Sequence, residues 1–117
     1  DVTHTVRSGP ERVAGLRRIP GPEAKMMADL LAAGNKLEAR WKNGQMAPMH
    51  DPSTAVYLLA PEIFEVKPCR VSIVTRPGAE FGRTRVKDTR RGPHAWVTAA
   101  DADAFFGVIE GLLKARA

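Results

Sequence analysis

Residues 47–62 read APMHDPSTAVYLLAPE, and this pattern predicts a helix that follows a loop and ends at a proline. Asp51 can cap the N-terminus of that helix, and Pro52 suits its first turn. The apolar side of the helix comprises Ala55, Val56, Leu58 and Leu59. His50 and Asp51 therefore stand side by side at a helix N-terminus. Spacing alone leaves two interpretations open: a helix cap beside a surface histidine, or a pair of groups that carry chemistry.

The sequence before this stretch predicts the end of a strand and then a short helix. Residues 2–6 have the composition of a strand. Ser8 and Glu11 fit a capping box, with Pro10 in the first turn of the helix. The apolar stripe of this helix consists of Val13, Leu16 and Ile19.

A longer helix is predicted over residues 23–41. Its apolar positions recur at spacings of three and four and comprise Met26, Met27, Leu30, Leu31, Leu37 and Trp41. Gly34 and Asn35 weaken the middle of this helix. Residues 43–49 contain a glycine and a proline and have no periodicity, so they are predicted to form a loop that leads to His50.

The sequence after residue 62 predicts short strands. Apolar residues alternate over residues 64–75, and a change of face at Pro68 indicates two strands or one strand with a bulge. Further strands are predicted over residues 84–87 and 95–99, with a turn before the first of them that is bracketed by Gly78 and Gly82.

The last predicted helix is the clearest element of the chain. Acidic residues, Asp101 and Asp103, lie at its start and basic residues at its end, which suits the helix dipole. Its predicted buried stripe comprises Phe105, Phe106, Ile109, Leu112 and Leu113.

The composition is that of a single domain spanning residues 1–117. The chain is 44% apolar, carries a formal charge of +5, and has one cysteine, Cys69, which excludes an internal disulfide. It has neither a membrane-length apolar stretch nor a secretion signal. We therefore expect a cytoplasmic location and no membrane partner. Because the first residue is not Met, and the sequence begins within a predicted strand, we also expect a truncated piece of a longer protein.

Three cations alternate along one predicted strand. Arg83, Arg85 and Lys87 would share one face of it, as binding to a nucleic acid would require. However, aromatic residues make up only 6% of the chain, and none is interleaved with these cations to stack on bases. We therefore favour a charge-protected edge strand over a nucleic-acid interface, which is retained as the minor alternative.

Four landmarks of the sequence, in the right order, resemble the inosine-uridine-preferring nucleoside hydrolases. Residues 49–52 resemble the C-terminal His-Asp motif of that family, and the helix that follows agrees with it. Residues 1–4 resemble an upstream strand end, residues 82–84 with Asp88 resemble a Gly-Arg-Thr strand, and residues 103–106 resemble the start of the last helix. The resemblance covers nearly the whole chain but only about the last third of a typical family member.

The resemblance implies hydrolysis of the N-ribosidic bond of purine or pyrimidine nucleosides to ribose and free base. It implies an α/β fold for this chain, with about four helices and three or four short strands, taken from an open and mostly parallel sheet. Family members bind one calcium ion, which holds the ribose hydroxyls and a nucleophilic water. Asp51 matches the C-terminal calcium ligand, which also touches the sugar, and His50 matches the residue that helps to protonate the departing base. Trp41, near the end of a helix that closes over the base, would stack on it, and the alternative is a role in core or surface packing.

The sequence also departs from the family. It lacks the aspartate-rich N-terminal motif that supplies most calcium ligands and the base that activates water. Calcium takes roughly 6 to 8 oxygen ligands, of which Asp51 can offer one or two. We therefore expect the isolated chain to have no hydrolase activity and no tight calcium site.

Two further expectations concern the polypeptide partners of the chain and whether it is part of an enzyme. Uncovered strand edges and apolar surface predict a homo-oligomer, or pairing with the missing N-terminal portion. The alternative to an enzyme segment is a truncated, non-catalytic homologue that acts as a binding or assembly module.

Overall fold

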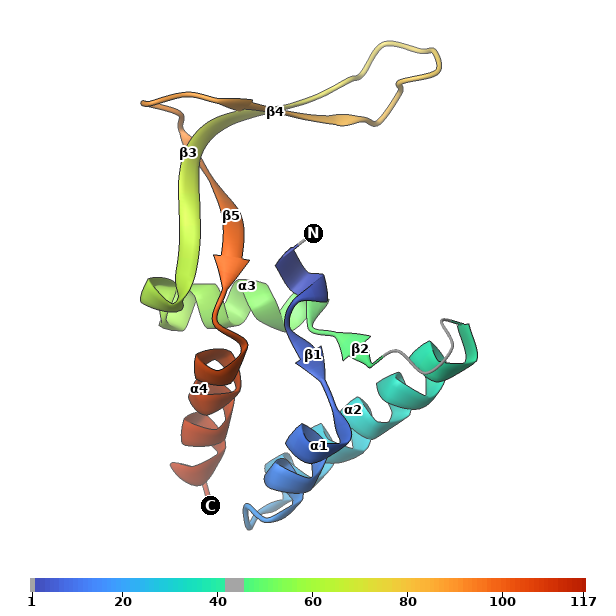
Figure 1. Ribbon diagram of the computed structural model, residues 1–117, viewed down its shortest axis with the longest axis vertical. Coiled ribbons are helices and arrows are strands. Elements are labelled where there is room, and N and C mark those ends of the chain that lie inside the picture. The colour runs from blue at the N-terminus through green and yellow to red at the C-terminus, as the bar shows by residue number, and fades with distance from the viewer. Residues whose placement is uncertain (1, 42–45) are drawn as a thin grey trace.

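The computed structural model describes residues 2–41 and 46–117 (Figure 1). The elements follow the order η1 (Val2–His4), β1 (Arg7–Ser8), α1 (Pro10–Arg17), α2 (Pro22–Trp41), β2 (Ala47–Pro48), α3 (His50–Leu59), η2 (Pro61–Ile63), β3 (Phe64–Ile73), β4 (Thr84–Asp88), β5 (His94–Ala100) and α4 (Ala102–Lys114). The strands form two antiparallel sheets, β1-β2 and β4-β3-β5. The predicted α/β class and the four helices are confirmed. The predicted loop over residues 43–49 lies outside the described residues at positions 43–45, and its second half contains the short strand β2.

Two local predictions for the N-terminal region are wrong. Residues 2–4 form a turn of 3-10 helix instead of a strand, because the Thr5 backbone N–H and the Thr5 hydroxyl both donate to the Val2 carbonyl, at 2.9 and 2.7 Å. The capping box is also absent. The N-cap of α1 is Gly9, which has no side chain to make a cap bond, and the Ser8 hydroxyl donates to Asn35 and to the Ala47 carbonyl instead of capping the helix.

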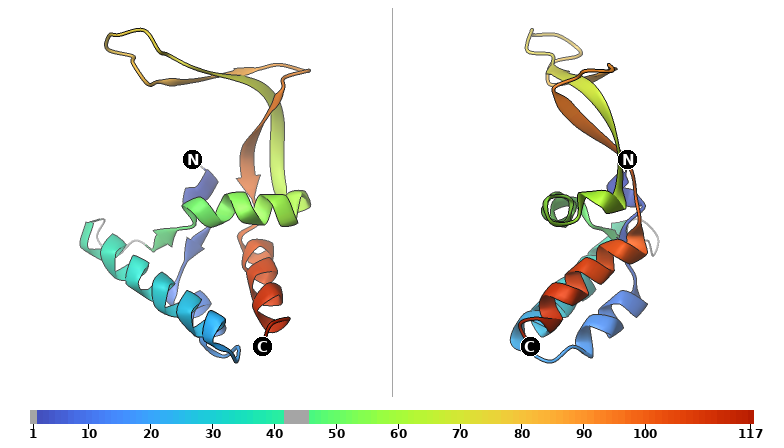
Figure 2. Two further views of the ribbon diagram at one scale, coloured as in Figure 1. Left: turned by 180° about the vertical axis from the view of Figure 1, so that it is seen from behind. Right: turned by 90° about the vertical axis from the view of Figure 1, so that its left-hand side faces the viewer.

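Helices α1 and α2 pack against each other and form one end of the molecule (Figures 1 and 2). The predicted stripe of α1 is confirmed, since Val13, Leu16 and Ile19 are all buried. The predicted stripe of α2 divides between two faces. Met27 and Leu31 pack against the core beside the buried Ala24 and Ala28, whereas the opposite face leaves four large side chains exposed: Met26, Leu30, Leu37 and Trp41.

Asp29 of α2 links the two helices by its ion pair with Arg17 of α1, and it forms a second ion pair with Lys25 in its own helix. Its carboxylate accepts hydrogen bonds from Lys25 and from Arg17, each at 3.1 Å. The hydrogen bond and the charge of Lys25, followed by those of Arg17, hold the pKa of the Asp29 carboxyl below its ordinary value of 3.8.

Strand β3 is the centre of the larger sheet. Strand β5 pairs with the first half of β3, up to the pair Cys69↔His94, and β4 pairs with the second half on the opposite edge, from Cys69↔Asp88 onward. The predicted irregularity in β3 is confirmed as a bulge, but it lies between Glu65 and Val66 instead of at Pro68. Between β4 and β5 the chain crosses from one edge of β3 to the other.

The crossing takes place over Cys69, which is fully buried, as expected for a small apolar side chain. Gly92 lies at this point, and a Cβ atom there would overlap the backbone of Cys69. A glycine is therefore required at position 92 for the chain to pass.

Residues 70–91 form a long arm that projects away from the rest of the chain (Figures 1 and 2). Every residue of β4 is exposed. The turn at the end of the arm contains Gly78 and Gly82 with φ values of +145° and +81°, which confirms the predicted turn and explains its two glycines.

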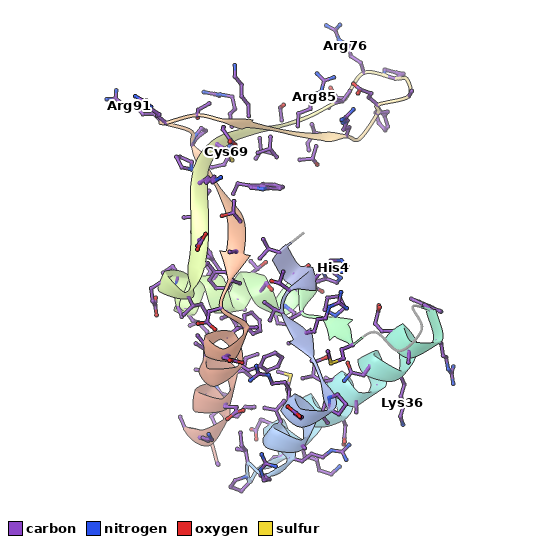
Figure 3. The ribbon with its side chains drawn as sticks, in the orientation of Figure 1. His4, Lys36, Cys69, Arg76, Arg85 and Arg91 are labelled. Atoms are coloured by element: carbon purple, nitrogen blue, oxygen red, sulfur yellow. The ribbon has the colours of Figure 1, made fainter. Side chains whose placement is uncertain are left out.

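Within the described residues, the basic strand of the arm pairs only with β3 and is therefore an edge strand. Lys87 pairs directly with Arg70 of β3, and Arg85 lies two residues along on the same face. Glu80 accepts hydrogen bonds from both Arg83 and Arg85. Figure 3 shows Arg76, Arg85 and Arg91 spread along the arm. This is the predicted arrangement of a charge-protected edge.

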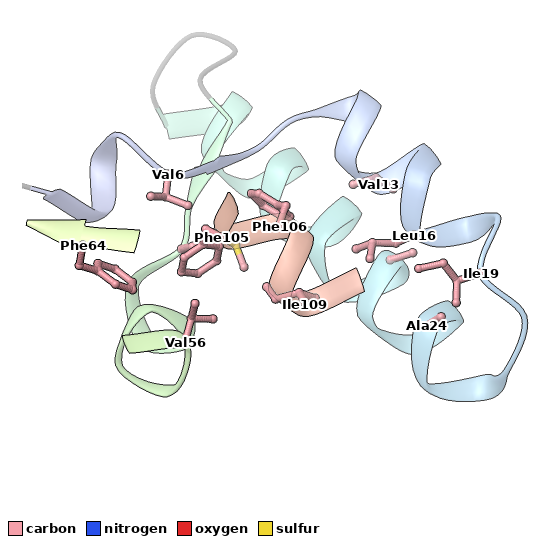
Figure 4. Packing of buried hydrophobic residues seen from close by; sticks show 12 residues of the cluster. Val6, Val13, Leu16, Ile19, Ala24, Val56, Phe64, Phe105, Phe106 and Ile109 are labelled. Atoms are coloured by element: carbon pink, nitrogen blue, oxygen red, sulfur yellow. The ribbon is translucent and has the colours of Figure 1, made fainter. Parts of the chain in front are cut away.

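The core lies where α4 meets α1, α3 and the base of β3 (Figure 4). Asp101 lies at the start of α4 as predicted, and it also caps the helix, because its carboxylate accepts from the backbone N–H groups of residues 103 and 104. Phe105 and Phe106 are buried, and Phe105 meets Phe64 edge to face at 6.4 Å. Leu112 was predicted to be buried and is 49% exposed, because the end of α4 extends past the core.

The molecule is extended, with dimensions of 49 × 33 × 19 Å and a radius of gyration of 17.0 Å. A compact chain of this length has a radius of gyration of about 13 Å. Its accessible surface is 8297 Å², whereas a compact monomer of this mass exposes about 6,200 Å². Among the described residues, no helix is both long and apolar enough to cross a membrane.

Candidate functional site

His50 and Asp51 are the first two residues of α3. Both side chains are exposed. Asp51 does not cap the helix as predicted; Met49 is the N-cap and makes no side-chain cap bond, so the carboxylate lies in the first turn instead. The exposed backbone N–H groups of the helix N-terminus favour the negative charge of Asp51 there. Because the Asp51 carboxylate does not cap the helix, its oxygens are open to a ligand.

Two residues from the N-terminal turn η1 contact the His50 ring. The Thr3 hydroxyl is 2.6 Å from Nδ1 of His50, and the two residues are 47 positions apart in the sequence. The His4 ring meets the His50 ring edge to face, with 5.2 Å between the ring centroids. Among the described residues, Nε2 of His50 has no hydrogen-bond partner, so this nitrogen is the one available to a ligand.

Arg7 holds the η1 turn beside the loop that leads to α3. Its Nε donates to the carbonyl of His4 and its Nη1 donates to the carbonyl of Met46, both at 2.8 Å. Its Nη2 lies 3.5 Å from Nδ1 of His4. A guanidinium has donors only, so Nδ1 of His4 is the acceptor in this contact. Figure 3 shows His4 at this junction.

A polar contact beneath β1 and β2 fixes the approach to His50. Oδ1 of Asn35, in the middle of α2, accepts from the Ala47 backbone N–H and from the Ser8 hydroxyl, both at 2.9 Å. Ser8 is fully buried. A Cβ atom on Gly34 would lie 3.4 Å from the Ala47 Cβ, which is a tight contact. Gly34 and Asn35, which have low helix propensity, are therefore the residues that let β2 pack against α2.

The strand pair β1-β2 and one further backbone bond complete this support. Arg7 pairs with Pro48 and Ser8 with Ala47. The Met49 backbone N–H then donates to the Val6 carbonyl at 2.9 Å, and Met49 itself is buried. The chain therefore enters α3 from a fixed direction.

An open groove lies beside η1. It is lined by Val2, Thr3 and residues 95–98 of β5, and it has a volume of about 700 Å³. Its walls are largely apolar, and they include Trp96, which is 44% exposed. Thr3 thus belongs to both the groove and the contact with His50.

The predicted site residues do not all lie in one place. The structure brings His50 into contact with Thr3 and His4, and Asp51 follows His50 in the first turn of α3. Trp41 is the last residue of α2 and is 76% exposed. In Figure 1 that end of α2 lies beyond β2, away from the start of α3.

Sequence reasoning missed four residues of this region: Thr3, His4, Arg7 and Trp96. His4 looks isolated in the sequence, and the available signal was the resemblance of residues 1–4 to a family landmark. His94, the other isolated histidine, has a structural role, because its Nδ1 accepts the Val71 backbone N–H at 3.1 Å.

The described residues do not form a calcium site by themselves. No group of three or more histidine, cysteine or acidic side chains that could hold a metal ion occurs in the part of the chain that the structure describes. Asp51 offers two carboxylate oxygens, against the roughly 6 to 8 oxygens that calcium takes.

These features, a His-Asp pair at a helix N-terminus supported by an upstream turn, fit the family that the sequence resembles. Residues 1–107 match the inosine-uridine preferring nucleoside hydrolases, and the chain belongs to that family.

Known relatives are similar over 87 residues, or 74% of this chain. A pyrimidine-specific ribonucleoside hydrolase, RihA, from Shewanella oneidensis is 39% identical, and RihA from Photobacterium profundum is 37% identical. An uncharacterised protein of Schizosaccharomyces pombe is 28% identical over 86 residues. The matched region is 27 to 28% of the length of these relatives, so the chain spans about a quarter of the curated relatives that it matches.

Proposed function

We propose that this chain contributes the His-Asp part of the active site of a nucleoside hydrolase, which cleaves the N-ribosidic bond of a nucleoside to give ribose and a free base. The observation that carries this proposal is the position of His50 and Asp51, side by side and exposed at the start of α3. Family membership supports it, and the names of the relatives favour a pyrimidine nucleoside as the first substrate to test.

In this proposal His50 protonates the departing base. Thr3 occupies Nδ1, so Nε2 is the atom that gives a proton to a ring nitrogen of the base as the bond from C1′ to nitrogen breaks. Water adds to C1′ and completes the hydrolysis. Without a proton the base leaves as a poor anion, and a positioned acid is worth about 10² to 10⁴ in rate.

We propose that Asp51 contacts a ribose hydroxyl and is one ligand of the calcium ion that the family implies. When bound, that ion would hold the ribose hydroxyls and the attacking water. The remaining ligands would have to come from the part of a nucleoside hydrolase that this chain does not span. The isolated chain is accordingly proposed to be inactive and to bind calcium weakly.

Trp41 is retained as a proposed contact to the base. Its indole is exposed and so is available to a ligand. Trp96 is the alternative, because it lines the groove that Thr3 also lines.

We propose that residues 1–117 act as one unit that needs a polypeptide partner, either further copies of itself or the remainder of the hydrolase fold. The support is the surface: it exceeds that of a compact monomer by about 2,000 Å². An interface that covers so much of one partner belongs to the obligate class. We place this unit in the cytoplasm, because its single cysteine is a free thiol.

A non-catalytic binding or assembly module is the second candidate. The observation that favours it is that the described residues alone do not make a metal site. Such a module would keep the scaffold and its partner surface but would release no ribose in any assembly.

The experiment that separates these candidates is a chimera. The matched segment of the Shewanella oneidensis relative is replaced by the corresponding segment of this chain, and ribose release from uridine and inosine is measured for the chimera and for the 117-residue chain. The proposal predicts an active chimera that His50→Ala and Asp51→Asn each disable, with His94→Ala as the matched histidine control. A folded chimera that releases no ribose would contradict the catalytic proposal and favour the module.

A further inference from the structure

We propose that Thr3 is a positioning residue for His50, whose oxygen accepts the Nδ1–H of the imidazole and thereby assigns the exchangeable proton to Nε2. The inference rests on the proposed function in one respect, the role of His50 as an acid. Its structural part, the tautomer of His50, can be tested without any activity.

The geometry places Thr3 at the correct nitrogen. The distance of 2.6 Å between the Thr3 hydroxyl oxygen and Nδ1 is that of a short hydrogen bond, and His50 is exposed on its other side. Because one ring nitrogen is engaged by the protein, the ring cannot turn over to present Nδ1 to a ligand without losing this bond.

The chemistry of an acid selects the direction of the hydrogen bond. Before the transfer the imidazolium carries a proton on each nitrogen, and Nδ1–H donates to the Thr3 oxygen. After Nε2 has given its proton to the base, Nδ1–H remains, and it donates to the same oxygen. A hydroxyl that accepts in both states therefore needs no rearrangement during the step, and this is the role that a second residue plays in orienting a catalytic histidine.

The rest of the N-terminal turn restricts the His50 ring further. His4 covers one edge of it at 5.2 Å between centroids, and Arg7 fixes the His4 carbonyl at 2.8 Å. The same guanidinium donates to the Met46 carbonyl and so links the turn to the segment before α3. Three contacts besides the Thr3 hydroxyl therefore set the position of Thr3 relative to His50. Two are hydrogen bonds of Arg7 to backbone carbonyls, and one is the contact between the His4 and His50 rings.

The test uses nitrogen-15 NMR of the 117-residue chain. The chain has only three histidines, so the ring signals of His50 can be assigned with His4→Phe and His94→Ala variants. In its neutral form, the wild-type His50 ring is expected to carry its proton on Nδ1. Thr3→Val removes the acceptor at nearly constant volume and is expected to shift His50 to the Nε2–H form or to a mixture. Thr3→Ser restores the hydroxyl and is expected to restore the wild-type spectrum.

Activity supplies the second readout, in the chimera described above. Thr3→Val is expected to lower kcat by about tenfold, the size expected from one hydrogen bond to a charged group, with KM nearly unchanged. Thr3→Ser is expected to recover most of kcat. Backbone spectra of each variant verify that it is folded.

The outcomes are distinct. A wild-type His50 in the Nε2–H form, or an unchanged tautomer in a folded Thr3→Val variant, overturns the proposal. So does an active chimera in which Thr3→Val leaves kcat unchanged. An inactive wild-type chimera refutes the proposed function instead, and the NMR result then still decides whether Thr3 sets the tautomer.

Discussion

Asn35 provides a stringent test of how the fold supports the site. Its Oδ1 accepts two hydrogen bonds, from the Ala47 N–H and the Ser8 hydroxyl, in a region where Ser8 is fully buried. Asn35→Leu keeps the branched shape of the side chain and improves the helix propensity of α2, but it removes both bonds. The Ser8 hydroxyl keeps its second acceptor, the Ala47 carbonyl at 3.2 Å, whereas the Ala47 N–H loses its partner.

The magnitude follows from these contacts. One hydrogen bond is lost at about 0.5 to 1.5 kcal/mol, and one donor is left unsatisfied at about 1 to 3 kcal/mol. The gain in helix propensity offsets about 0.5 kcal/mol of this loss. We therefore expect Asn35→Leu to lower the free energy of unfolding by about 1 to 4 kcal/mol.

Asn35→Asp is the matched control. Both partners of Asn35 donate, so a carboxylate oxygen can replace the amide oxygen, and we expect a loss below about 1 kcal/mol. The assay is urea unfolding followed by circular dichroism, with the slope of the transition compared among the three proteins. Equal destabilisation by Leu and Asp would refute the acceptor role, and a neutral Asn35→Leu would refute the importance of the contact.

Two further predictions concern the arm and the acid limit of stability. Gly92→Ala should destabilise the crossing of β3, because a Cβ atom there overlaps the Cys69 backbone. It should therefore raise the reactivity of the Cys69 thiol toward a disulfide reagent. The control is Gly107→Ala, which has open space around it and should leave that reactivity unchanged. Asp29 has a pKa lowered in the folded state, chiefly by its hydrogen bond to Lys25, so its contribution is present above about pH 3.8 and is lost as the pH falls below that value. Urea midpoints measured from pH 7 to pH 2.5 should therefore converge for wild type and Asp29→Asn at low pH, and parallel curves would contradict this.

The elements that the sequence predicts well are those with local causes. Helix α4 has its cap, Asp101, and its buried residues within one short stretch, so the pattern suffices to place it. The turn with Gly78 and Gly82 is equally local, since both glycines adopt a positive φ.

The features that sequence reasoning missed depend on distant residues. Ser8 looks like the start of a capping box, but a partner 27 positions away, Asn35, takes its hydroxyl. The same contact explains why a residue with low helix propensity occurs in the middle of α2. Thr3 and His50 are 47 positions apart, and no spacing rule connects them.

The apolar stripe of α2 shows a different limit. Periodicity identifies this helix as amphipathic, but its apolar residues cover two faces. Met27 and Leu31 face the core of this chain, while Met26 and Leu30 face outward. The apolar pattern of a sequence does not distinguish side chains that pack within the chain from side chains that can pack against another polypeptide. It therefore overestimates the core of one chain.

The most direct test of the central claim, that His50 is the acid of a nucleoside hydrolase, compares two leaving groups in the chimera. Uridine needs a proton on its departing base, whereas the leaving group of p-nitrophenyl riboside is p-nitrophenolate, which is a stable anion without a proton. We expect His50→Ala to lower kcat on uridine by about 10² to 10⁴, as for loss of a general acid, and to leave hydrolysis of the nitrophenyl riboside almost unchanged. Equal losses on both substrates would contradict the assignment of His50 as the proton donor.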